Sequence, residues 1–251
     1  MEKYDFYDIN KNAWDYKSYE YWVKLYGTPS EFALKLKENP REYLKNYISY
    51  FDEFSGKRII NICGSMGKLA IACSLLGSIV TIVDISEHGK RYALELANEA
   101  STKIEYYDEN ILDFKINKMY DISFMYTGIA HYFEDLDLLF DKIFSLTKPG
   151  GCLIYSDLHP YLKIQDGQNL INKMNYFDSS SVFGEMPLYR YFSNEDKKDA
   201  PKCIYREHTL CTIINSIINS GFRIIRFDET PFTSEDFPCK FYIKAVKSEN
   251  L

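Results

Sequence analysis

Three of the chain's four histidines stand where a predicted strand or a long irregular segment ends, and histidine is the side chain that exchanges protons most readily near neutral pH. His131 follows the fourth predicted strand, His159 follows the fifth, and His208 lies where the irregular segment ends. His88 follows the second predicted strand, near Asp84. The first three are therefore candidate general bases, which an enzyme needs where its substrate must lose a proton.

Each of these histidines also has a purely structural interpretation. His131 can pack or form a hydrogen bond without moving a proton. Alternation along a strand puts Asp157 and His159 on one side, which favours a pair that contacts substrate. His208 can touch substrate or cap a helix that begins at Thr209. Three converging histidines would also suit a metal, but the sequence has no HxxxH spacing, and we predict no metal site.

The stretch from Arg58 to Asp84 predicts a strand, a turn, a helix and a second strand. The turn at 63–67 contains Gly64 and Gly67, which have no Cβ and let a ligand approach the backbone. Asp84 ends the unit about twenty residues after the turn begins, where nucleotide-binding βαβ units place the group that accepts hydrogen bonds from a ribose. The stretch is apolar enough to suggest a membrane helix, but its three glycines and interior Lys68 favour two buried strands around a helix.

Composition limits the partners. The 251 residues are 46% hydrophobic, which suits one α/β domain with additions. The net charge is −6, and no basic run is long enough to line a groove, so nucleic acid is a disfavoured partner. The six cysteines have no CxxC spacing and are typical of reduced thiols, and the first ten residues have no apolar core of a secretory signal. We therefore expect a cytoplasmic protein.

Strands and helices alternate through the middle of the chain, which predicts a mostly parallel sheet. Helices are expected at residues 68–76, 89–100, 136–146 and 209–220. Two final strands, at 222–227 and 241–246, predict an antiparallel hairpin at one sheet edge. Residues 1–55 predict a helical cap, with Thr28, Pro29 and Glu31 opening one helix and Pro40 to Phe54 forming another. Residues 157–206 are rich in aromatic and polar side chains and predict a lid inserted into the domain 56–251.

From about Lys57 onward, the order of these features resembles the class I S-adenosylmethionine (SAM) dependent methyltransferases. The features are the strand and turn of NICGSMGK, the VDIS that ends the second strand, the Tyr-Asp that opens the fourth, the KPGG before the fifth, and the terminal helix and strands. The motifs IAHYFEDL, SDLHP and the aromatic YEYW and YGTP near the N-terminus are similar to a group of uncharacterised methyltransferases of low-GC bacteria. This resemblance implies a Rossmann-like α/β fold with a seven-stranded sheet.

The resemblance also implies a cofactor site. Asp84 would hold the ribose hydroxyls, Asn110 would lie near the adenine amino group with Ile111 on the ring, and the end of the fourth strand would face the methionine part. In the family, the first strand commonly ends on an acidic residue before a Gly-x-Gly-x-Gly loop, whereas this chain has Asn61. The implied contacts are Asn61, Cys63, Gly64, Ser65 and Gly67, then Asp84, Ile85 and Ser86, then Asn110 and Ile111, and finally Tyr126, Thr127 and Gly128. Cys63 suits packing better than nucleophilic attack.

We therefore expect a methyltransferase that moves the SAM methyl group to O or N of a small molecule under an aromatic-rich lid. No membrane or nucleic-acid partner is expected, and the sequence does not specify the oligomeric state. An NAD-dependent oxidoreductase is the first alternative, although the turn lacks GxGxxG. A catalytically silent SAM-binding protein is the second, because the opening turn departs from the family pattern. RNA methylation is disfavoured by the acidic charge.

Overall fold

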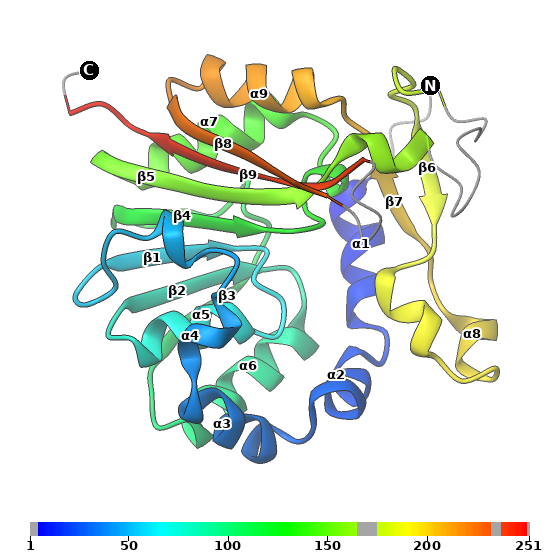
Figure 1. Ribbon diagram of the computed structural model, residues 1–251. Helices are drawn as coiled ribbons and strands as arrows, with labels where there is room; N and C mark the ends of the chain where they lie inside the picture. The colour runs from blue at the N-terminus through cyan, green and yellow to red at the C-terminus, as the bar shows by residue number, and fades with distance from the viewer. Residues whose placement is uncertain (1–4, 165–174, 232–236, 250–251) are drawn as a thin grey trace. The chain divides into compact units, whose positions relative to one another are not determined.

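A seven-stranded sheet runs through the protein, in the strand order β3-β2-β1-β4-β5-β9-β8 (Figure 1). The computed structural model describes residues 5–164, 175–231 and 237–249. β1 pairs in parallel with β2 and β2 with β3, whereas β9 pairs antiparallel with both β5 and β8. This confirms the predicted mostly parallel sheet with an antiparallel C-terminal pair at its edge. The strands are β1 (Arg58–Ile62), β2 (Ile79–Asp84), β3 (Ile104–Asp108), β4 (Tyr120–Tyr126), β5 (Thr147–Leu158), β8 (Arg223–Pro231) and β9 (Pro238–Val246).

The chain forms two compact units, Met1–Tyr120 with Phe183–Ile204 and Asp121–Val182 with Tyr205–Leu251. In the first unit, helix α5 packs against β2 and β3, helix α6 packs against β3, and α6 also packs against α2 and α3. Thr28 and Glu31, which were predicted to open this helix, form a capping box at the start of α3. The helices of this unit are α1 (Phe6–Asp15), α2 (Ser18–Tyr26), α3 (Pro29–Glu38), α4 (Pro40–Tyr43), α5 (Lys68–Leu75), α6 (Glu87–Glu99) and α8 (Asp196–Asp199), with 3-10 turns η1 (Ile48–Tyr50) and η4 (Pro187–Tyr191).

In the second unit, the amphipathic helices α7 (Leu136–Leu146) and α9 (Leu210–Asn219) lie side by side, and α9 packs on β8 (Figure 1). Thr209 supplies the side-chain cap of α9, so His208 is not the cap. The 3-10 turns η2 (Ala130–Tyr132) and η3 (Pro160–Ile164) follow β4 and β5. His131 lies within η2, and His159 immediately precedes η3.

The inserted segment contains regular structure on both sides of 165–174, which lie outside the described residues. β6 (Ser181–Gly184) and β7 (Cys203–Arg206) form a separate two-stranded sheet. Between them, Asp196 accepts hydrogen bonds from the hydroxyls of Tyr21 at 2.8 Å and Ser193 at 2.7 Å, and it also pairs with Lys17. Within the first unit, the segment at 187–199 is therefore bound to the N-terminal helices by side-chain contacts.

One helix predicted from the sequence is wrong. Residues 40–54 form only the single turn of α4 and the 3-10 turn η1. The aromatic rings of Tyr47, Tyr50, Phe51 and Phe54 are all buried, with Phe51 stacked on Phe54 at a centroid distance of 4.6 Å. Aromatic residues are poor helix formers, and burial of these rings in irregular turns outweighs the weak helical preference of the segment.

β5 is also longer than predicted, because it begins at Thr147 and includes the KPGG that was expected to precede it. Gly150 has φ of 76° and its N–H donates to the carbonyl of Lys247 at 2.8 Å, so the glycine lets the strand continue into pairing beyond β9. In the parts of the chain that the structure describes, none of the helices has both the length and the apolar composition that crossing a membrane requires.

Candidate functional site

The turn after β1 holds its shape by alternating left-handed residues. Cys63, Ser65 and Gly67 have φ of 50°, 51° and 76°. A Cβ on Gly64 would lie 2.6 Å from Oδ1 of Asn61, so glycine is required there by the buried amide packed against it. Burial raises the pKa of the Cys63 thiol well above its usual value, and the nearby Asp84 raises it further. Cys63 is therefore a packing residue rather than an activated nucleophile.

Asp84 at the end of β2 is the buried carboxylate of this unit, with 8% of its surface exposed. Its Oδ2 accepts the N–H of Ser65 at 2.8 Å, and its Oδ1 accepts the N–H of Ser86 at 2.9 Å. Burial raises the pKa of Asp84, and the amides of Ser86 and Ser65 oppose that shift. Asp84 does not cap α6, because Ser86 is the N-cap and accepts from Gly89 at 2.9 Å.

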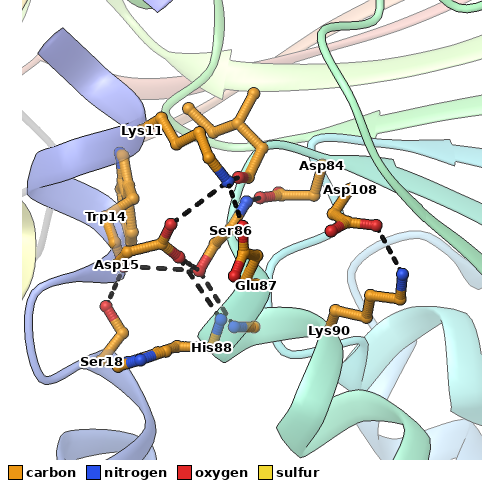
Figure 2. A network of polar contacts seen from close by, with 12 residues as sticks. Lys11, Trp14, Asp15, Ser18, Asp84, Ser86, Glu87, His88, Lys90 and Asp108 are labelled. Carbon is orange, nitrogen blue, oxygen red and sulfur yellow. Dashed lines mark hydrogen bonds and ion pairs between the residues drawn. The ribbon is translucent and has the colours of Figure 1, made fainter. Parts of the chain in front are cut away.

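The carboxylate thus joins the first turn to the loop after β2. A carboxylate has about four lone-pair positions, and the N–H groups of Ser65 and Ser86 occupy two of those on Asp84. The remaining positions can accept hydroxyl hydrogen bonds from a diol. Side chains of α1 also contact the loop after β2. Lys11 donates a hydrogen bond to the carbonyl of Ile85, and Asp15 accepts one from the hydroxyl of Ser86 (Figure 2).

The end of β3 places a second carboxylate beside the first. Asp108 is opposite Asp84 in the parallel register, and its Oδ1 lies 2.5 Å from Nζ of Lys90. Lys90 lowers the pKa of Asp108. Asn110 is half-buried, and its Oδ1 accepts the N–H of Leu112 at 3.1 Å, which makes it a turn residue in this structure, while Ile111 is buried.

In the second unit, Asp157 organises the loop that follows β4. Its two carboxylate oxygens accept the N–H groups of Gly128 at 2.5 Å, Ile129 at 3.2 Å and Ala130 at 3.0 Å. The hydroxyl of Tyr155 donates to the same carboxylate at 2.9 Å. Asp157 is 3% exposed, so its carboxylate fixes the loop and leaves little surface for a substrate.

The loop so held contains the predicted methionine-facing residues. Thr127 has φ of 26° and Gly128 has φ of 86°. The N–H of Thr127 donates to the carbonyl of Ser156 at 2.7 Å. The ring of Tyr126 lies 5.6 Å from that of Phe124. The only side chain within 4 Å of a Cβ built on Gly128 would be His131, at 3.9 Å among the described residues, so this face of the loop is open apart from the His131 ring.

The three candidate histidines differ in what their ring nitrogens contact. In His159, Nδ1 accepts the N–H of Tyr161 at 3.0 Å and Nε2 lies 2.8 Å from the Glu229 carboxylate. Nε2 of His208 donates to the carbonyl of Phe133 at 2.8 Å. For His131, no hydrogen-bond partner of either ring nitrogen is found among residues 5–164, 175–231 and 237–249.

Burial also lowers the pKa values of two of these histidines, His131 and His159. Burial lowers the pKa of His131, and the carboxylates of Asp157 and Glu207 oppose that shift. The ring lies 4.2 Å from that of Tyr132 and 5.8 Å, edge on, from that of Tyr205. Burial likewise lowers the pKa of His159 against the opposing Glu229. The lowered pKa of His131 favours its uncharged ring, and its ring nitrogens have no hydrogen-bond partner in the described part of the protein.

The sequence analysis did not identify three residues that contribute to these loops, namely Lys11, Asp15 and Asp108. Asp108 could have been found by counting parallel register from Asp84. The roles of Lys11 and Asp15 had no local signal, because they lie more than seventy residues from the loop they contact. In the described part of the chain, no group of three or more His, Cys, Asp or Glu side chains is arranged to hold a metal ion.

Comparisons with known proteins bear on this arrangement. A family model described as a methyltransferase domain matches residues 59–151. A methyltransferase of Geobacillus sp. is 23% identical over 181 residues, which cover 69% of this chain and 69% of that protein. A ubiquinone biosynthesis O-methyltransferase of Rickettsia canadensis is 27% identical over 146 residues, which cover 57% of this chain and 59% of that enzyme.

Solved structures share the fold. A SAM-dependent methyltransferase from Listeria monocytogenes aligns with a TM-score of 0.64 at 20% identity, over 83% of this chain and 99% of that one. Magnesium protoporphyrin IX methyltransferase from Synechocystis, solved with bound S-adenosylhomocysteine (SAH), aligns with a TM-score of 0.63 at 16% identity, over 97% and 100% of the two chains. At these identities the likeness shows the fold, and the match to the methyltransferase domain is confined to residues 59–151.

The residues present fit the cofactor of that family. Asp84 is a buried acceptor with lone pairs to spare for two ribose hydroxyls, and its charge suits hydroxyl donors. The turn at 63–67 exposes no charged side chain that would repel a sulfonium. Residues 59–151 therefore match a methyltransferase domain, and the seven-stranded sheet has the fold of the SAM-dependent methyltransferases.

Proposed function

We propose that the protein transfers the SAM methyl group to an oxygen or nitrogen of a small-molecule acceptor, with His131 as the general base. When bound, SAM supplies a methyl group activated by its sulfonium sulfur. With SAM bound, the acceptor oxygen or nitrogen would take the methyl group, SAH would be the leaving group, and His131 would take the proton that the acceptor loses. Such a displacement depends mainly on alignment and on exclusion of water.

The observation that carries the choice of base is the state of the three histidine rings. His159 and His208 use ring nitrogens to contact Glu229 and Phe133, which supports a structural role for both. His131 is half-buried, its pKa is lowered, and its nitrogens have no partner in the described residues. A hydroxyl acceptor is a weak acid at neutral pH, so a neutral imidazole beside it can take its proton.

The first unit would hold the nucleoside part of the cofactor. Asp84 is proposed to accept hydrogen bonds from the two ribose hydroxyls, and the turn at 63–67 to pass along the ligand with its backbone. We propose Asp108 as the acceptor for the adenine amino group, because Asn110 already binds the backbone of its own turn. Residues 126–128 in the second unit would face the methionine part.

Residues 1–55 and 157–206 are proposed to roof the acceptor. The described part of these segments is rich in aromatic side chains, including Tyr16, Tyr21 and Phe192, which pack together with ring distances of 4.4 Å and 5.6 Å. A closed aromatic roof would exclude water and suit a planar or amphipathic acceptor. Since the Rickettsia relative is named as an O-methyltransferase, oxygen acceptors should be tested first.

The test is methyl transfer from labelled SAM to a panel of hydroxylated aromatic compounds and amines. With the best acceptor, we expect His131→Gln to lower kcat by about 10²-fold or more, the usual contribution of a general base. His208→Gln is the matched control, and it should change thermal stability without abolishing turnover. Equal kcat in His131→Gln and the wild type would refute the role of the base.

A further inference from the structure

The N-terminal helix α1 contacts the loop that follows β2 through two charged side chains (Figure 2). Nζ of Lys11 donates to the carbonyl of Ile85 at 3.0 Å and lies 3.1 Å from the carboxylate of Glu87. It also lies 3.3 Å from Asp15, one turn further along α1. The ammonium therefore joins α1 to the backbone and to the first residue of α6.

Asp15 contacts the same loop at Ser86 and His88. Its Oδ1 accepts the hydroxyl of Ser86 at 2.9 Å and the N–H of His88 at 3.3 Å (Figure 2). A carboxylate is stabilised at this place, because free N–H groups and the helix dipole make the N-terminus of α6 positive. The side chains of Lys11 and Asp15 are about three-quarters buried, with 26% and 23% of their surfaces exposed.

These contacts are more than the folding of α6 requires. Ser86 already caps α6 by accepting the N–H of Gly89 at 2.9 Å, and it is 3% exposed. What Asp15 adds is a fixed orientation for the Ser86 hydroxyl and the peptide groups around it. The N–H of Ser86 is also the donor to Oδ1 of Asp84, at 2.9 Å. A shift of the loop therefore moves a hydrogen-bond partner of the buried carboxylate.

We propose that Lys11 and Asp15 are positioning residues for the cofactor, which act by holding the 84–88 loop in the geometry that Asp84 needs. This inference rests on the proposed assignment of Asp84 to the ribose. Neither side chain is assigned a contact with the reacting atoms. Binding of the nucleoside part and docking of α1 are then coupled, because each stabilises the same conformation of the loop.

The experiment measures SAH affinity by isothermal titration calorimetry for Lys11→Ala, Asp15→Ala, and the conservative variants Lys11→Arg and Asp15→Glu. We expect the alanine variants to raise the SAH Kd by about five-fold or more, the effect of losing charged hydrogen bonds that hold the loop. Lys11→Arg keeps a donor and is expected to restore most of the affinity. Lys45→Ala, which removes an exposed ion pair with Glu42, is the matched control and should leave Kd unchanged.

Hydrogen exchange of residues 84–90 separates positioning from general destabilisation. Asp15→Ala should increase amide exchange in this segment in the absence of SAH, whereas exchange in β4 and β5 stays as in the wild type. An unchanged SAH Kd in both alanine variants would overturn the inference. Failure of the wild type to bind either SAM or SAH would instead overturn the proposed function.

Discussion

Replacement of Asp157 by asparagine tests whether this carboxylate organises the loop after β4. Oδ1 accepts the N–H groups of Gly128 and Leu158, and Oδ2 accepts those of Ile129 and Ala130. An asparagine amide has one oxygen, so its NH₂ group faces two backbone N–H groups in either orientation. At least two donors therefore lose their acceptor.

The cost follows from that count. A buried donor left without an acceptor costs about 1 to 3 kcal/mol, so two of them cost about 2 to 6 kcal/mol. For a chain of this length each kcal/mol lowers Tm by about 2 to 4 °C, so we expect Tm to fall by about 4 to 24 °C. Turnover should fall as well, because the disturbed loop leads into His131.

Differential scanning calorimetry of Asp157→Asn and of Asp121→Asn makes the comparison. Asp121 pairs with Lys148 at 2.7 Å on the partly exposed start of β4, and loss of such a pair is worth less than about 1 kcal/mol. A Tm for Asp157→Asn within 2 °C of that of the Asp121 control would refute the reasoning. It would mean that the loop at 128–130 does not depend on this carboxylate.

Three further predictions concern backbone strain, pH and the inserted segment. Ser65→Gly relieves a left-handed residue with φ of 51° and should raise the unfolding free energy by up to about 1 kcal/mol, whereas Ser145→Gly near the end of α7 should lower it in denaturant titrations. Burial raises the pKa of Asp84 above its usual 3.8, and protonation of this carboxylate removes the acceptor that the ribose needs. SAH affinity measured by calorimetry should therefore begin to fall on acidification before pH 3.8 is reached. An SAH affinity that does not change down to pH 3.8 would contradict the assignment. Hydrogen bonds with Lys17, Ser193 and Tyr21 hold the pKa of Asp196 far below 3.8, so the stabilising effect of its carboxylate is present above pH 3.8 and is lost below it. The Tm difference between wild type and Asp196→Asn should therefore shrink on acidification through pH 3.8. A Tm difference that stays constant would contradict this stabilising role of Asp196.

Features with a local cause could be predicted from the sequence. Apolar runs located the strands of the sheet, and helix α7 has the predicted bounds of Leu136 and Leu146. Thr28 and Glu31 correctly predicted the start of α3, because the contacts of the capping box are formed within four consecutive residues. The acidic residue at the end of β2 was likewise placed correctly at Asp84.

Features that depend on contacts between residues far apart in the chain could not be predicted from the sequence. Asp157 was interpreted as half of a substrate-contacting pair with His159, yet its partners lie 27 to 29 residues earlier in the chain. Which histidine keeps its ring nitrogens available depends on Glu229 and Phe133, and no local pattern predicts these neighbours. The helix expected at 40–54 failed for a similar reason, because burial of its aromatic rings is a tertiary effect.

The most direct test of the central claim is calorimetric titration of the wild type and Asp84→Asn with SAM and SAH. Asparagine keeps the size of the side chain but removes the charge that strengthens hydroxyl hydrogen bonds, each worth about 1.5 to 3 kcal/mol. The account predicts that the wild type binds both ligands and that Asp84→Asn raises both Kd values by about ten-fold or more. Absence of binding to the wild type at millimolar ligand, or equal affinity of the two proteins, would contradict it.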